Sequence, residues 1–68
     1  MDNSKDLNRL KVVLAEKKRT NKWLAEQLGK GTATVSKWCT NTAQPSLKNM
    51  IEIAKCLNVN LDELVRKE

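Results

Sequence analysis

The chain has 68 residues, 40% of them hydrophobic and 31% charged, which suits one small globular domain and is too apolar for a disordered chain. With no His, Phe or Tyr, two Gly and one Pro, the composition excludes His-based catalysis and disfavours an all-β fold. The net charge of +5 is uneven, since residues 1–48 hold ten Lys or Arg against four Asp or Glu. This favours a polyanionic partner, although it is also typical of a soluble surface.

Hydrophobic spacing predicts five helices joined by short connections, and therefore an all-α domain. The first helix begins near Leu7, where Ser4 or Asp6 can cap it, and ends in the basic run 17–19, which suits the negative end of the helix dipole. Its inward stripe is formed by Leu7, Leu10, Val13 and Leu14.

The second and third predicted helices are short and have clear ends. The second covers about 21–28, with Thr20 as its N-cap and Gly29 as its stop. The third covers about 32–40 and is followed by Asn41, a residue that tolerates a left-handed backbone.

The fourth helix starts after Pro45, with Ser46 as its cap, and its broad apolar face comprises Leu47, Met50, Ile51, Ile53, Ala54 and Leu57. The fifth opens at Asn60 with a capping box completed by Glu63. Its apolar stripe consists of Leu61, Leu64 and Val65. We expect this stripe to form a homodimer interface, with closure of the monomer core as the alternative.

The stretch from Thr20 to Trp38 predicts a helix-turn-helix unit, with bounds of about 20–40. Ala25 is small enough to let the second helix of the unit approach, and Gly29 supplies the positive φ that a tight turn requires. The side chains predicted to face inward from the two helices are Leu24, Leu28, Val35, Trp38 and Cys39.

The opposite face of the third predicted helix is small, hydroxylated and basic. At about 100° per residue it comprises Thr32, Ala33, Ser36, Lys37 and Thr40, and the helix holds no carboxylate. Such a face fits a DNA major groove, where methyl groups can touch thymine and Ser36 and Lys37 can donate to base edges. The alternative is an ordinary solvent-exposed face that binds no partner. The residues that predict the tight turn, Ala25 and Gly29, favour a helix-turn-helix unit over this alternative.

Five short motifs follow one another along the chain: LAEQLG at 24–29, TVSKW at 34–38, PSL at 45–47, IA at 53–54 and LNV at 57–59. Their order resembles the phage-repressor (Cro/lambda-repressor, or XRE-like) helix-turn-helix family, over about residues 7–65. The resemblance implies a compact five-helix DNA-binding domain, here a single domain over 1–68, that works as a homodimer on a pseudo-palindromic operator.

The resemblance also implies which residues touch DNA. Those at the start of the third helix read bases: Thr32, Ala33, Ser36 and Lys37. Phosphates are contacted from the start of the second helix, by Thr20 and Asn21, and from the connection between the third and fourth helices, which includes Asn41, Thr42 and Ser46. Beyond the resemblance, we also expect phosphate contacts from Lys22, Lys30, Thr34, Thr40 and Lys48. Free N–H groups at helix N-termini agree with this assignment. The lysines among them can equally be solvated.

The chain departs from the family's pattern in four places. Asn21 and Gly31 stand where Gln and Ser are frequent. Leu14 and Cys39 replace residues that often form an ion pair, and we interpret them as an apolar contact. Trp23 occupies a position that is usually polar. It can contact a sugar-phosphate edge or a partner protein, but we favour packing against the core.

We therefore predict a cytoplasmic, sequence-specific transcriptional regulator, of repressor type, with double-stranded DNA and a second copy as its partners. No enzymatic activity, cofactor or metal is expected, and no apolar run is long enough for a membrane span. Cys39 and Cys56 are expected to be free thiols. Two alternatives remain open: an antitoxin or restriction-system controller that also binds a protein such as a toxin, and a pure protein-interaction module.

Overall fold

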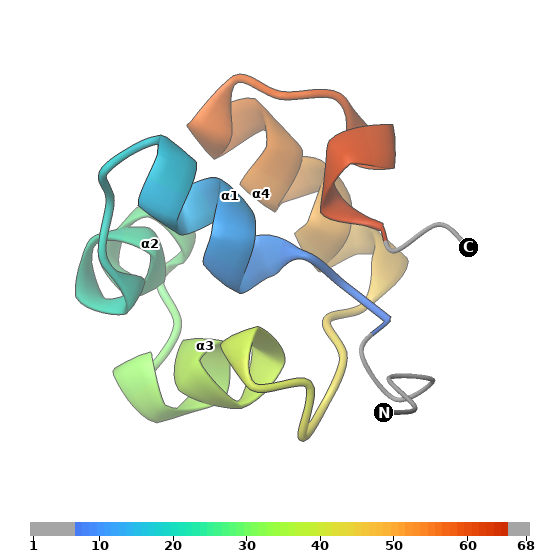
Figure 1. Cartoon of the computed structure of the whole chain (residues 1–68). Helices are drawn as coiled ribbons and strands as arrows, with labels where there is room; N and C mark the ends of the chain where they lie inside the picture. The colour runs from blue at the N-terminus through green and yellow to red at the C-terminus, as the bar shows by residue number, and fades with distance from the viewer. Residues whose placement is uncertain (1–6, 66–68) are drawn as a thin grey trace.

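The computed structural model describes residues 7–65. In chain order they form α1 (Leu10–Glu16), α2 (Asn21–Leu28), α3 (Thr32–Cys39), α4 (Leu47–Leu57) and a short 3-10 helix, η1 (Leu61–Leu64). The helix α2 packs against α3 and α4, while α1 contacts α3 and η1. Figure 1 shows α3 along one edge of the molecule, with no described helix beyond it. The predicted all-α architecture is confirmed for the described residues.

One hydrophobic core joins all five elements. Its residues are Leu10, Val13, Leu14, Leu24, Ala25, Val35, Trp38, Cys39, Ile53, Ala54, Leu57 and Leu64. The set predicted to face inward from α3 (Val35, Trp38 and Cys39) is confirmed, while Leu28 of α2 is half-buried at the edge of the core. Each fully buried large side chain contributes roughly 1.5–3 kcal/mol through its removal from water.

The predicted helix ends of α2 and α4 are confirmed. The Thr20 hydroxyl accepts a hydrogen bond from the Trp23 N–H (3.0 Å), and the Ser46 hydroxyl accepts one from the Asn49 N–H (3.1 Å). Gly29 ends α2 with φ +67°. These caps are local, because each lies within three residues of the group it satisfies.

The first helix is shorter than predicted. It begins at Leu10, and Leu7, which was expected on its inward stripe, is 57% exposed. The reason is a long-range pairing: Asn8 forms an isolated antiparallel bridge with Val65, and the Arg9 N–H donates to the Leu64 carbonyl (2.8 Å). The helix ends at Glu16, before the basic run. Ser4 and Asp6, proposed as caps, lie outside the described residues.

The fifth predicted helix is a single turn of 3-10 helix, so the expected five-helix count is wrong. Its capping box is present, with the Glu63 carboxylate accepting from the Asn60 N–H (3.2 Å). Val65 then becomes extended in order to pair with Asn8, which stops the helix. Leu64 is 0% exposed and closes the core, which corrects the expectation that it lies at a dimer interface.

The buried face of α4 is narrower than the sequence pattern indicated. Ile53, Ala54 and Leu57 are buried and Met50 is half-buried, as predicted for the apolar face. In contrast, Leu47 and Ile51 of that face are 68% and 42% exposed.

Candidate nucleic-acid interface

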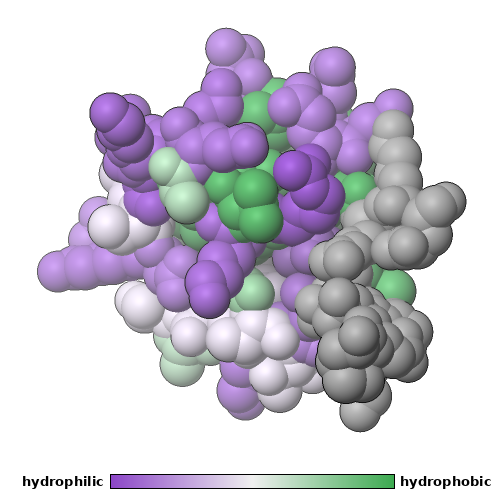
Figure 2. Space-filling view, viewed as in Figure 1, coloured by the Kyte–Doolittle hydropathy of each residue, from purple (hydrophilic) through white to green (hydrophobic). Residues whose placement is uncertain are grey.

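The outward face of α3 is open to solvent. Thr32, Ala33 and Lys37 are exposed and Ser36 is half-buried, whereas Val35 on the opposite side is 0% exposed. Figure 2 shows a largely pale surface across the lower part of the molecule, where Figure 1 places α3, in contrast to the strongly hydrophilic areas and hydrophobic patches above it. The small hydroxylated residues of α3 therefore form a surface that is neither strongly charged nor strongly apolar.

The turn between α2 and α3 fixes the direction of that face. The Lys30 N–H donates to the Ala25 carbonyl (3.0 Å) around the left-handed Gly29. Ala25 is 2% exposed beneath the packed helix pair, as its small size predicted. Gly31 is the N-cap of α3 in an ordinary extended conformation, with φ −73° and ψ 147°. Only Gly29 therefore needs the conformational freedom of glycine.

The start of α2 lies beside the end of α3. The half-buried Asn21 accepts a hydrogen bond on Oδ1 from the Cys39 thiol (3.2 Å). This bond turns the amide oxygen inward and leaves the Nδ2 group as the outward donor. The Trp23 N–H is bonded to the Thr20 hydroxyl, but the N–H groups of Asn21 and Lys22 precede the first intrahelical bond, so this corner can receive an anion.

The Cys39 thiol can donate the hydrogen bond to Asn21 Oδ1 because it stays protonated. Burial raises the pKa of its thiol, and the positive charge of Lys11 only partly opposes this effect. Cys39 and Leu14 both lie in the core, at the two positions interpreted as an apolar contact. Both cysteines are free thiols, as predicted; Cys39 is buried and Cys56 is half-buried.

The hydroxyl groups after α3 are bonded among themselves. Thr40 Oγ1 donates to the Lys37 carbonyl (3.2 Å), and it lies 2.8 Å from Thr42 Oγ1. A hydroxyl has one hydrogen, so Thr42 is the donor in the second bond and neither threonine keeps an O–H for a phosphate. In contrast, the Thr20 and Ser46 oxygens accept their cap bonds and retain their hydrogens as donors.

Asn41 has an internal role in addition to its expected place at the interface. It is left-handed (φ +60°), as predicted, and its side chain bonds to Asn8 and Gln44. Sequence reasoning did not single out Asn8 or Gln44. Neither belongs to a periodic pattern or a capping motif, and 33 residues of chain separate Asn8 from Asn41.

Trp23 packs against the hydrophobic core, as predicted, and is half-buried. The Arg19 guanidinium lies over its ring, 4.5 Å from the centroid. A cation held in this way is worth about 0.5–1 kcal/mol at an exposed site. The ring is therefore covered from two sides by its own chain, which leaves little of it for a partner.

A family model described as helix-turn-helix matches residues 10–64. The chain belongs to this helix-turn-helix family. The predicted resemblance is thereby confirmed. The crystal structure of a candidate DNA-binding protein from Bacteroides fragilis is also similar, with 57% sequence identity and a TM-score of 0.87 over 88% of this chain and 97% of that chain. No curated protein matches the chain.

The family match covers all of α2 and α3, the two helices predicted to form the helix-turn-helix unit. The residues expected to touch DNA fall into two groups. Exposed side chains are Thr20, Lys22, Lys30, Thr32, Ala33, Thr34, Lys37, Thr40, Thr42, Ser46 and Lys48, while Asn21, Ser36 and Asn41 are half-buried. Across residues 7–65, no helix is long and apolar enough to cross a membrane.

Proposed function

We propose that this helix-turn-helix protein is a sequence-specific DNA-binding transcriptional regulator, of repressor type, in which α3 enters the major groove. The observation that carries the proposal is the exposed outward face of α3, which lacks a carboxylate and lies beside the start of α2. The similar protein from Bacteroides fragilis, described as a candidate DNA-binding protein, supports DNA as the ligand.

The base-reading role falls to the exposed residues of α3. Lys37 is fully outside the core and can donate to O6 and N7 of guanine, while the methyl groups of Thr32 and Ala33 can contact thymine. Ser36 is half-buried, so its hydroxyl reaches only a base edge that comes close to the helix axis. These contacts give the sequence preference.

The phosphate-binding role falls to groups on both sides of α3. The Nδ2 group of Asn21 and the exposed lysines Lys22, Lys30 and Lys48 can bind the backbone on either side of the groove. The Thr20 and Ser46 hydroxyls add neutral donors at the N-termini of α2 and α4. Such contacts set the register of the protein on the duplex without reading the sequence.

We also propose that the protein binds as a homodimer to two half-sites about 34 Å apart. Of the predicted interface, Leu61 is half-buried and Val65 is 41% exposed, so both keep a surface that a second copy can cover. A monomer this small presents few contacts, so dimerisation increases the affinity for a two-part site.

Titration of duplex binding against salt tests the proposal. Each phosphate contact lowers the logarithm of affinity by about 0.9 per unit of log salt on B-DNA, so a steep negative slope is expected. The variant Lys22→Ala should reduce that slope by about one, whereas Lys55→Ala, at the far end of α4, should leave it unchanged. Weak binding with a flat slope would instead favour the protein-interaction module.

A further inference from the structure

Asn8 is a polar side chain that is only 4% exposed. Its amide is fully bonded: Oδ1 accepts from the Leu10 N–H (2.9 Å), and Nδ2 donates to the Trp38 carbonyl (2.9 Å) and to Gln44 Oε1 (2.8 Å). Two of these partners belong to the end of α3 and the loop after it. A buried polar group with every bond made fixes the geometry of the groups around it.

The other side of the contact is Asn41, in the left-handed conformation at the first position of that loop. Its Oδ1 accepts from the Asn8 N–H (3.0 Å) and from Gln44 Nε2 (3.0 Å), and its Nδ2 donates to the Asn8 carbonyl (3.3 Å). Asn8, Asn41 and Gln44 thus bond to one another in a closed ring, which we call the amide clamp.

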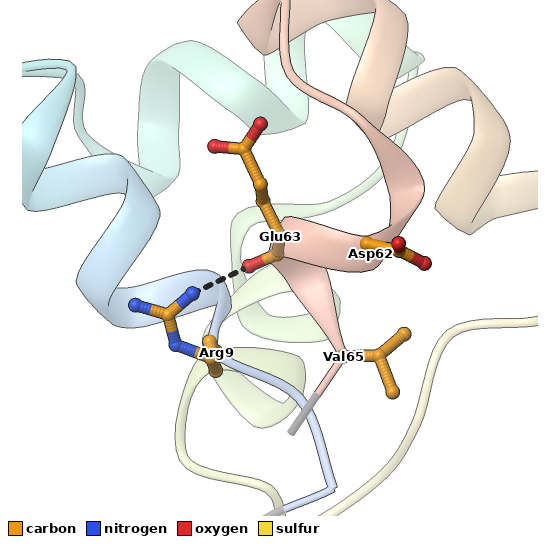
Figure 3. A pocket seen from close by; sticks show the side chains of 4 residues that line it. All are labelled: Arg9, Asp62, Glu63 and Val65. Carbon is orange, nitrogen blue, oxygen red and sulfur yellow. Dashed lines mark hydrogen bonds between the residues drawn. The ribbon is translucent and has the colours of Figure 1, made fainter. Parts of the chain in front are cut away.

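The amide clamp joins a segment that is itself held firmly. On the side away from the loop, the Arg9 N–H donates to the Leu64 carbonyl (2.8 Å), and the Arg9 guanidinium donates to the Glu63 carbonyl (3.0 Å; Figure 3). The loop at 41–46 is therefore connected through Asn8 and Arg9 to η1. Without the clamp, the first residues of the loop keep bonds to the end of α3 alone: the Asn41 N–H donates to the Trp38 carbonyl, the Thr42 and Ala43 N–H groups donate to the Lys37 carbonyl, and the Thr42 hydroxyl bonds to Thr40.

We propose that Asn8 is a positioning residue for DNA binding: through Asn41 and Gln44 it holds the loop at 41–46, and with it the Ser46 hydroxyl at the start of α4, in place for the phosphate backbone. The inference rests on the proposed function. Asn8 is buried and touches no DNA. Asn8 orders the loop before DNA binds. The free-energy cost of ordering the loop therefore does not reduce the binding affinity.

Asn8→Ala and Gln44→Ala test this role in the whole chain. The first removes both bonds from Nδ2 and the bond from the Leu10 N–H to Oδ1, while the bonds between the Asn8 backbone and the Asn41 side chain stay. The second removes the two bonds of Gln44 within the clamp; since Gln44 is exposed, this variant is expected to stay folded even where Asn8→Ala does not. Arg9→Ala is the matched control, because it removes the neighbouring bond to Glu63 and leaves the amide clamp intact.

Two readouts separate positioning from simple stabilisation, both taken where every variant is folded. Duplex affinity of the clamp variants should fall about tenfold, equally for preferred and random sequences, because the ordering cost is not sequence-dependent. Hydrogen exchange at the Thr42 and Ala43 amides should accelerate in the free protein, with no change at the Leu24 amide in α2. Arg9→Ala should change neither readout.

The outcomes are distinguishable. If the wild-type protein binds DNA and the folded clamp variants bind it with the same affinity, the positioning role is overturned and the proposed function stands. A loss confined to the preferred sequence would also overturn it, since that result assigns Asn8 to base reading. If the wild-type protein itself shows no duplex binding, the proposed function fails and the positioning role fails with it.

Discussion

At the scale of single residues, the structure uses side chains chiefly to orient one another. Cys39 donates its thiol hydrogen to Asn21 Oδ1 (3.2 Å), and this bond determines which end of the Asn21 amide points outward. The bond exists only while the thiol is protonated. Because burial raises the pKa of Cys39, protonation extends above the range of an exposed thiol.

The raised pKa of Cys39 predicts a pH dependence of stability. The unfolded thiol loses its proton near its ordinary pKa of about 8.5, whereas the folded one retains it to a higher pH. The unfolded state thus binds fewer protons in this window, so the free energy of unfolding decreases as pH rises through it. Urea denaturation from about pH 7 to about pH 10 should show a steeper decrease in wild type than in Cys39→Ala. Parallel profiles would contradict this account.

At the scale of elements, the turn between α2 and α3 depends on one glycine rather than two. Gly29 is left-handed (φ +67°) and Gly31 is not, although an added Cβ would meet no atom within 4 Å at either position. Any cost of substitution at Gly29 therefore comes from backbone strain and not from crowding.

Gly29→Ala should destabilise the protein by about 1–2 kcal/mol, the cost of a left-handed non-glycine residue. Gly31→Ala is the matched control and should cost less: alanine is a poorer N-cap than glycine, but it adopts the extended backbone there without strain and reduces the entropy of the unfolded chain. Thermal or urea unfolding of both variants measures the difference. Equal losses for the two variants would show that the turn does not depend on the conformation of Gly29.

Local signals explain how much of the fold the sequence predicted. The bounds of α2 were correct because Thr20 and Gly29 act on groups within a few residues. The start of α1 and the nature of η1 were wrong because the bridge between Asn8 and Val65 decides both, and no local pattern reports such a pairing.

The candidate site divides in the same way. The exposure of Thr32, Ala33 and Lys37 follows from helical periodicity, so the sequence predicted it. The amide clamp could not be predicted, since Asn8 lies 36 residues from Gln44 in the sequence. A single Asn near the start of a predicted helix is ordinarily expected to be exposed to solvent. Contacts of this kind depend on the tertiary fold alone.

At the scale of the whole molecule, the two ends of the described chain close the core together. Leu64 is 0% exposed, and its carbonyl accepts from the Arg9 N–H (2.8 Å). In a domain of this size a single core supplies roughly 3–5 kcal/mol, so one buried leucine accounts for a large share of the total. Val65, the next residue, is 41% exposed.

Leu64→Ala should cost about 2–5 kcal/mol, enough to leave the domain largely unfolded. The loss should not depend on protein concentration, because the side chain packs within one copy. Val65→Ala, the matched control, should change the unfolding free energy little and should weaken self-association if Val65 contacts a second copy. Circular dichroism at several concentrations checks both. If the Leu64→Ala protein recovers its fold at high protein concentration, Leu64 contributes to a dimer interface instead.

The central claim is that the outward face of α3 reads DNA. Selection of binding sites from a random duplex pool tests it most directly, with wild type, Lys37→Ala and Asn21→Ala compared side by side. The wild type should enrich one motif in two symmetric halves. Lys37→Ala should lose the preference at one position in each half, at a cost of about 1–3 kcal/mol, while Asn21→Ala should bind more weakly with the motif unchanged. Enrichment of the same motif by Lys37→Ala with undiminished affinity, or of no motif by the wild type, would contradict the claim.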